Sequence, residues 1–337
     1  VLAIPSAYLL TRLGPKSAGL IALGCTGLGS VVGALASGAT TLLLGRIMEG
    51  VGSSLMVILA PAVISMWFGP QDRGLPMGIW AAWIPVGNVI VFNLAHPLLA
   101  AFGWRAVWWF GALVVVLAFV LYGLVVDAPP VRSRGEVPAS PSHGSFGKMI
   151  LNPTTWLLGL AFGAFGFSLL GYNTWAPAFL LETLNADAAV AGFVASLMFL
   201  AAIPANIMAG WLLTRTQHRN RLLSVAFFVT GILFLWAFGL PNLAVAALYM
   251  VMLGFASNFI PTAVFTLAPA TMPRLQLAGL SLAIVTMGAG LGVLFGPPAL
   301  GSILSEGNWL LGGVCLAVVM GVGTIASVLA GRRMGDI

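Results

Sequence analysis

The sequence has little charge and few residues that serve as metal ligands. Asp, Glu, Lys and Arg make up 7% of its 337 residues, against about 25% in ordinary soluble domains. Two cysteines are too few for a disulfide scaffold. His96, His143 and His218 lie far apart, and no Cys or Asp accompanies them at ligand spacing. We therefore expect no metal and no cofactor.

Hydrophobic residues are abundant instead, at 60% of the chain. A soluble protein could not cover so much apolar sequence with so few polar side chains. The net charge of +6 is spread too thinly to indicate nucleic acid as a partner. Because about 20 apolar residues cross a bilayer as a helix, the sequence predicts an all-α membrane protein. The expected spans are 1–11 (half a bilayer), 17–36, 42–68, 75–98, 106–126, 150–176, 189–213, 222–240, 243–266, 278–303 and 309–331.

Lys and Arg are distributed unevenly over the loops between these spans. When the loops are taken alternately, one set carries twelve of the fourteen basic residues. The opposite set carries only Arg105, and Arg46 lies inside a span. Since basic residues mark cytoplasmic loops, we expect the C-terminus to be cytoplasmic and the protein to lie in the cell membrane, plasma or inner.

A polar segment divides the spans into five and six. Residues 127–149 are rich in Pro, Ser and Gly, which is typical of a flexible linker. We expect it to be cytoplasmic and to separate an N-terminal bundle, residues 1–126, from a C-terminal bundle, residues 150–337.

The two bundles repeat one another in sequence. Residues 7–12, AYLLTR, match residues 210–215, GWLLTR, at an offset of 203, and Arg73 matches Arg274 at an offset of 201. Matches on the same side of the membrane predict parallel repeats related by an axis along the membrane normal.

The repeat also predicts that the first bundle is incomplete. The second unit begins about 65 residues before Arg215, whereas only 11 residues precede Arg12. By this measure roughly 54 residues are absent, which leaves about eleven of twelve spans. A natural eleven-span protein is the alternative.

Four segments resemble motifs of the major facilitator superfamily. Residues 7–16, AYLLTRLGPK, resemble the loop after the second span of that family. Residues 45–52, GRIMEGVG, resemble its R-x-x-x-G-x-G pattern in the fourth span. Residues 102–105, FGWR, resemble its fifth-to-sixth loop, and residues 296–301, GPPALG, its Gly-Pro kink in the eleventh span. Within the superfamily, Met77–Trp80 and the Gly-Trp-Arg loop resemble a branch of bacterial carriers similar to cyanate and nitroimidazole transporters.

This resemblance implies a secondary transporter without enzymatic activity. Two six-helix bundles would rock around a central site and move a small molecule across the lipid bilayer, coupled to an ion, the proton. We expect a monomer. The alternatives are a membrane-embedded enzyme, for which Glu49 is the one acidic residue inside a span, and a sensor or scaffold, which would usually bring a soluble domain.

The resemblance also implies an inner gate around residues 7–16. This sequence departs from the family motif at Ala7, which stands for Gly, and at Thr11, which stands for Asp and removes a carboxylate from the charge network used there. The residues expected to form the gate are Arg12, Gly14, Lys16, Arg73 and Arg215.

Arg46 and Glu49 are the charges most firmly inside a span. A charge at the bilayer centre costs about 2.5–3.5 kcal/mol on insertion scales. Their i, i+3 spacing places both on one helix face, where they can pair. One interpretation is a structural ion pair. The other is a cavity pair in which Glu49 exchanges a proton or Arg46 attracts an anion.

Several amides also lie within the spans. Most amides in apolar helices form hydrogen bonds between helices, and the rest could line a substrate path. We single out Asn173, because the seventh span lines the cavity in the resembling family. The candidates for the substrate and proton pathway are Arg46, Glu49, Asn88, Asn93, Tyr172, Asn173, Asn206 and Asn258.

Overall fold

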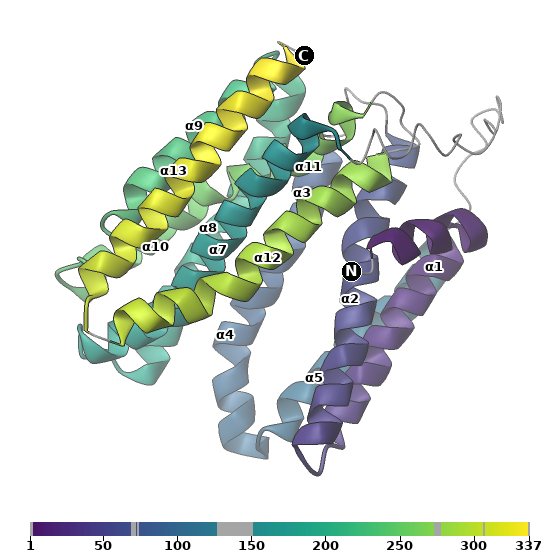
Figure 1. Ribbon diagram of the computed structural model, residues 1–337. Coiled ribbons are helices and arrows are strands. Elements are labelled where there is room, and N and C mark those ends of the chain that lie inside the picture. Colours follow the sequence, from purple (N-terminus) through teal and green to yellow (C-terminus); the bar gives the residue numbers. More distant parts are fainter. Residues whose placement is uncertain are drawn as a thin grey trace. The chain divides into compact units, whose positions relative to one another are not determined.

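The computed structural model describes residues 3–68, 72, 74–126, 151–272, 278–305 and 307–335. Every regular element in these ranges is a helix (Figure 1), so the expected all-α fold is confirmed. The linker 127–149 and Arg73 lie outside the described residues, as does the side chain of Arg12. The elements are α1 (Ala3–Ala34), α2 (Ala39–Trp67), α3 (Gly74–Ala81), α4 (Trp83–Phe102), α5 (Arg105–Val125), α7 (Pro153–Glu182), α8 (Ala188–Arg215), α9 (Arg219–Phe234), α10 (Leu243–Ser257), α11 (Phe259–Leu267), the 3₁₀ turn η1 (Ala268–Thr271), α12 (Ala278–Leu304) and α13 (Trp309–Met334).

Nine helical stretches among the described residues are long and apolar enough to cross a membrane. They coincide with nine of the eleven expected spans. The stretch expected at 222–240 overlaps α9, which has 16 residues and ends at Phe234. From Leu235 onward the chain continues in tighter i→i+3 turns. The stretch expected at 1–11 is the start of α1, which bends at Gly14.

The helices form two compact units. The first consists of Val1–Pro70 and Leu94–Pro141, and the second of Gln71–Asn93 and Ser142–Ile337. The helix α3 thus packs with the second unit, because it contacts α8 and α11. The bundle boundaries at 126 and 150 follow from the polar segment 127–149 in the sequence, not from packing, and stay a prediction.

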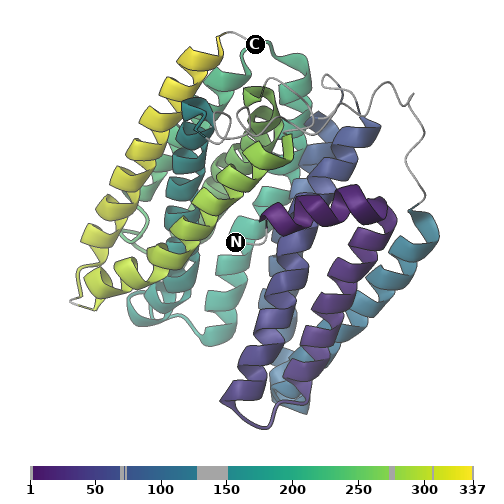
Figure 2. The same ribbon diagram turned by 45° about the vertical axis from the view of Figure 1, so that its right-hand side comes forward.

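In the first unit α1 packs between α2 and α5, as Figure 2 shows. The contact with α2 is close because glycines face one another. A Cβ at Gly29 would lie 2.6 Å from the backbone nitrogen of Glu49, and one at Gly45 would lie 2.9 Å from the carbonyl oxygen of Gly29. Since lipid tails are as apolar as leucine, such close van der Waals contact, not hydrophobic burial, holds membrane helices together.

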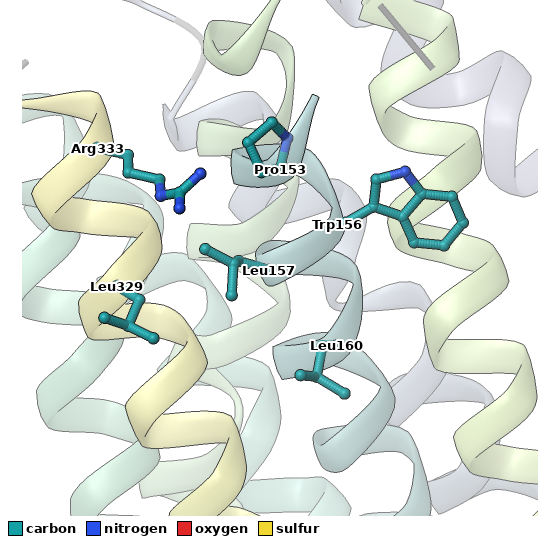
Figure 3. A pocket seen from close by; sticks show the side chains of 6 residues that line it. All are labelled: Pro153, Trp156, Leu157, Leu160, Leu329 and Arg333. Atoms are coloured by element: carbon teal, nitrogen blue, oxygen red, sulfur yellow. The ribbon is translucent and has the colours of Figure 1, made fainter. Parts of the chain in front are cut away.

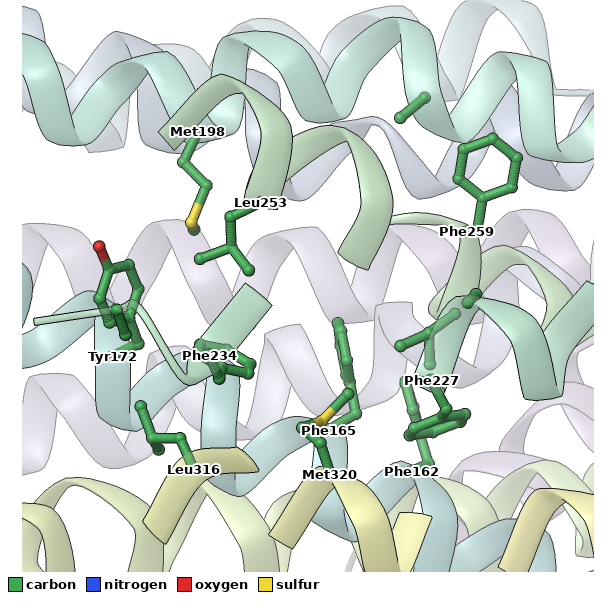
Figure 4. Packing of buried hydrophobic residues seen from close by; sticks show 14 of the residues in the cluster. Phe162, Phe165, Tyr172, Met198, Phe227, Phe234, Leu253, Phe259, Leu316 and Met320 are labelled. Carbon is green, nitrogen blue, oxygen red and sulfur yellow. The ribbon is translucent and has the colours of Figure 1, made fainter. Parts of the chain in front are cut away.

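In the second unit α7 packs against both α12 and α13. Its contact with α12 is again backbone to backbone: a Cβ at Gly288 would overlap the carbonyl oxygen of Gly159, and one at Gly292 that of Gly163. On other faces the helices enclose a core of aromatic and aliphatic side chains (Figure 4). Its largest fully buried members include Tyr172, Phe179, Phe227 and Phe234.

The start of α7 follows directly from its sequence. Asn152 caps the helix, because its side-chain oxygen accepts a hydrogen bond from the Thr154 backbone N–H at 3.0 Å. Pro153 takes the first helical position, where no backbone N–H is required. The Asn152 side chain also donates to the carbonyl oxygen of Thr271 at 2.7 Å, which ties this end of α7 to η1.

Candidate functional site

The predicted ion pair on α2 is present in the first unit. The Arg46 guanidinium donates to Glu49 Oε2 at 2.9 Å. The two partners differ in accessibility, since the Arg46 side chain is 65% exposed and the Glu49 side chain 18%. The pair therefore presents a cation at the surface of the unit and holds its carboxylate against the neighbouring helix.

Ser30 and Trp108 complete this cluster from two other helices. The Ser30 hydroxyl on α1 donates to Glu49 Oε1 at 2.5 Å, so each carboxylate oxygen has its own donor. The Arg46 guanidinium carbon lies 4.1 Å from the centre of the Trp108 ring on α5, which is a cation–π contact. Sequence analysis missed both residues, because neither is close to Glu49 in the chain.

This arrangement suits either of the two interpretations. Each oxygen of the Glu49 carboxylate accepts a hydrogen bond from a neighbouring side chain, as a structural pair requires. The exposed guanidinium is also free on one side to meet an anion, as a cavity pair requires.

A second polar cluster lies buried in the second unit. Thr262 on α11 donates to Asn206 Oδ1 on α8 at 2.9 Å, and Asn206 Nδ2 donates to Asn258 Oδ1 at 3.3 Å. The Asn258 side chain in turn donates to the carbonyl oxygen of Gly254 at 2.9 Å. Asn258 stands where α10 ends and α11 begins. The network thus fastens this break in the helix to α8.

Tyr172 and Asn173 are adjacent on α7 but differ in environment. Tyr172 is fully buried, its hydroxyl 3.5 Å from the sulfur of Met250 and its ring against Phe234 and Phe238. Asn173 is half-buried, and within the described part of the chain its side chain has no hydrogen-bond partner. Of the two, Asn173 has the accessible polar group.

Among the described residues, Asn88 and Asn93 bond only within their own helix. The Asn88 side chain donates to the carbonyl oxygen of Ile84 at 2.9 Å, and that of Asn93 to Val89 at 2.8 Å. Each donor reaches back one turn along α4, which leaves the side-chain oxygen available. Neither residue joins the two clusters above among the described contacts.

The residues expected at the gate are only partly described. Gly14 has φ 75°, and it forms the bend in α1 that any other residue would adopt with strain. The Tyr122 hydroxyl on α5 donates to the carbonyl oxygen of Pro15 at 2.9 Å and holds that bend. Lys16 is half-buried. Arg215 ends α8, its guanidinium 4.5 Å from the Trp211 ring.

The sequence matches the family described as the Major Facilitator Superfamily over two overlapping segments, residues 1–276 and 176–334. Together these segments cover nearly the whole chain. The chain belongs to the Major Facilitator Superfamily.

Relatives within the superfamily include named transporters. The chain is 27% identical to the hexuronate transporter of Bacillus subtilis over 179 residues, which is 51% of this chain and 42% of that protein. It is 22% identical to a probable sulfoacetate transporter of Cupriavidus necator over an alignment that covers 95% of this chain and 79% of that protein. In three of the curated relatives the matched stretch spans 34%, 42% and 24% of the relative's length.

Solved structures of the superfamily share the fold. The E. coli fucose:proton symporter superposes with a TM-score of 0.77 at 14% identity, covering 98% of this chain and 87% of the symporter. Such a likeness shows the carrier fold predicted from the sequence and does not identify a substrate.

Proposed function

We propose that this chain moves a small organic anion across the membrane by alternating access, coupled to protons. The observation that carries the proposal is the Arg46–Glu49 pair inside an apolar helix. A charged pair there is costly unless water or substrate reaches it, and Arg46 is the exposed partner. The names of the hexuronate and sulfoacetate transporters support an anionic substrate.

We assign these residues separate roles in transport. Arg46 attracts the anion, while Glu49 gives up and takes back the coupling proton. Asn173 contacts the substrate from α7, because its amide has donors and an acceptor to spare. The amides of Asn206 and Asn258 already satisfy one another and keep α8 and α10 together.

The bundles 1–126 and 150–337 would rock about this site, with the linker 127–149 between them. We place the gate at the bend of α1, with Arg12, Gly14 and Lys16, and at its repeat around Arg215, together with Arg73. The protein would act as a monomer and without a cofactor or enzymatic activity. The resemblance to the cyanate and nitroimidazole branch stays a prediction.

Uptake into proteoliposomes tests the function. The purified chain is reconstituted and given a pH gradient and radiolabelled organic anions, with hexuronates and sulfoacetate first. We expect accumulation that collapses when a protonophore removes the gradient. A sensor, scaffold or enzyme without transport predicts no flux of any substrate under either condition, and that result would refute the proposal.

The proposed orientation places the C-terminus in the cytoplasm of a cell or inner membrane. With Cys25 and Cys315 first replaced by serine, single cysteines are introduced at His218, before α9, and at Asn308, before α13. We expect a membrane-impermeant maleimide to label intact cells at position 308 and to label position 218 only after permeabilisation. The reverse pattern would overturn the orientation.

A further inference from the structure

Two adjoining hollows run along α7 in the second unit. The first has a volume of about 450 Å³ and lies between the start of α7 and the end of α13 (Figure 3). The second, of about 410 Å³, continues along α7 between α12 and α13. Trp156 and Leu160 line both hollows. The two therefore form one groove, which we call the α7 groove.

One end of the α7 groove is positively charged. Among the described residues, Arg333 is the one charged residue that lines it, and Figure 3 shows its side chain extending from α13 toward Pro153 at the start of α7. Within the described part of the chain, Arg333 has no carboxylate partner. The helix dipole of α7 adds a partial positive charge at this end. This end of the groove suits a negatively charged group.

The rest of the α7 groove is apolar. Gly159, Gly163 and Gly288 form part of its floor, where the backbones of α7 and α12 lie in close contact. Exposed hydrophobic side chains form its walls, among them Leu291 from α12, 50% exposed, and Val322 from α13, 44% exposed. In a membrane such a face lies against lipid tails. The groove thus joins a cationic end to an apolar trough.

We propose that the α7 groove binds one anionic phospholipid. Its phosphate lies between Arg333 and the start of α7, and one acyl chain lies along the glycine floor between α12 and α13. Charge complementarity favours this occupant, because basic pockets between helices near a membrane surface bind anionic headgroups. Trp156 lies where headgroup and tail meet, the level at which tryptophan is enriched in membrane proteins.

Neighbouring residues on α13 provide matched controls. Arg332 carries the same charge at the same helix end, but it lines a different hollow with Asn220 and Arg221. Val318 is 63% exposed one turn before Val322 and does not line the groove. Arg333→Gln therefore compares with Arg332→Gln for the headgroup, and Val322→Trp compares with Val318→Trp for the acyl chain.

Native mass spectrometry of the purified full chain measures the binding. The chain is titrated in detergent with phosphatidylglycerol, with phosphatidylcholine of the same acyl chains, and with inorganic phosphate. We expect one phosphatidylglycerol to be retained in preference to phosphatidylcholine. Arg333→Gln weakens its retention about fivefold, the effect of one basic residue near an anionic surface, and Arg333→Lys restores most of it. Val322→Trp lowers the retention of phosphatidylglycerol, because the indole fills the trough.

Four outcomes would overturn the proposal. Equal retention of phosphatidylglycerol and phosphatidylcholine would show that the headgroup charge does not contribute to binding. Equal losses in Arg332→Gln and Arg333→Gln would indicate general attraction to a basic surface. If inorganic phosphate competes with the lipid and Val322→Trp has no effect, the site binds an anion without an acyl chain. Equal effects of Val318→Trp and Val322→Trp would show that the acyl chain does not lie in the α7 groove. None of these measurements depends on transport activity.

Discussion

The polar cluster described in the first unit contains a charged pair, whereas the polar cluster in the second unit is neutral. Glu49 and Arg46 are partly exposed, but Asn206 and Thr262 are fully buried. The neutral cluster satisfies itself, because each amide finds a partner on a neighbouring helix or one turn away. The charged pair leaves a cation at the surface. The comparison teaches that polarity alone does not mark function, and that accessible, incompletely partnered groups are the better candidates.

Removing the carboxylate of the charged pair should have the largest effect. Glu49→Gln keeps the shape of the side chain but cannot exchange a proton. We expect it to abolish accumulation driven by the pH gradient while substrate exchange persists, because exchange moves no net proton. Uptake and counterflow in proteoliposomes measure the two activities. Ser53→Ala is the control, since Ser53 donates to the backbone oxygen of Glu49 and not to its carboxylate.

The same pair can be tested by a double-mutant cycle. If the pair is purely structural, Arg46→Gln and Glu49→Gln each lower thermal stability and the double variant recovers part of the loss. If it works in transport, uptake stays absent in the double variant whatever the stability. Accumulation at the normal level in Glu49→Gln would show that Glu49 does not carry the proton.

Breaking the neutral cluster should affect stability and not transport. Asn206→Leu leaves the Thr262 hydroxyl and the Asn258 amide without their shared partner. We expect a loss of about 1 kcal/mol in the free energy of unfolding, the size usual for hydrogen bonds between membrane helices. Asn88→Leu is the control with almost no loss, because Asn88 bonds only within α4. Unfolding in detergent mixtures, followed by tryptophan fluorescence, measures both. Equal losses of unfolding free energy in Asn206→Leu and Asn88→Leu would contradict the structural role assigned to Asn206.

A smaller effect is expected at Asn173, which lacks a partner among the described residues. Asn173→Leu should leave the free energy of unfolding within a few tenths of a kcal/mol of the original. It should raise the substrate concentration for half-maximal uptake about threefold to tenfold, the factor that corresponds to the free energy of one hydrogen bond. A variant that loses stability but keeps its uptake constants would place Asn173 with Asn206 as a structural amide.

The sequence predicts the parts of this molecule that depend on local pattern. Nine expected spans coincide with long helices, because hydropathy reports directly on which segments bury their backbone in lipid. The Arg46–Glu49 pair follows from its i, i+3 spacing. The C-terminal part of the stretch at 222–240 was predicted less well, because hydropathy does not register the shift from α-helical to i→i+3 turns after Phe234.

The partners of the site residues depend on tertiary structure and could not be predicted. Ser30 reaches Glu49 only because glycines bring α1 and α2 together. Asn206 and Asn258 meet across 52 residues of sequence. Conversely, Asn88 looked the same as Asn206 in sequence, yet it has no neighbour from another helix among the described hydrogen bonds. Thr262 offered a faint signal, since it lies one turn after Asn258.

The glycine contact between α7 and α12 has a consequence for the entropy of assembly. Helices that meet through long side chains must freeze rotamers at their interface, at up to about 1.5–2 kcal/mol for each residue. Gly159, Gly163, Gly288 and Gly292 have no rotamers to lose, so these two helices join without that cost. A substitution of Gly288 or Gly292 by alanine would leave the rotamer entropy unchanged, but the added Cβ would overlap the facing backbone, force the two helices apart and weaken their contact.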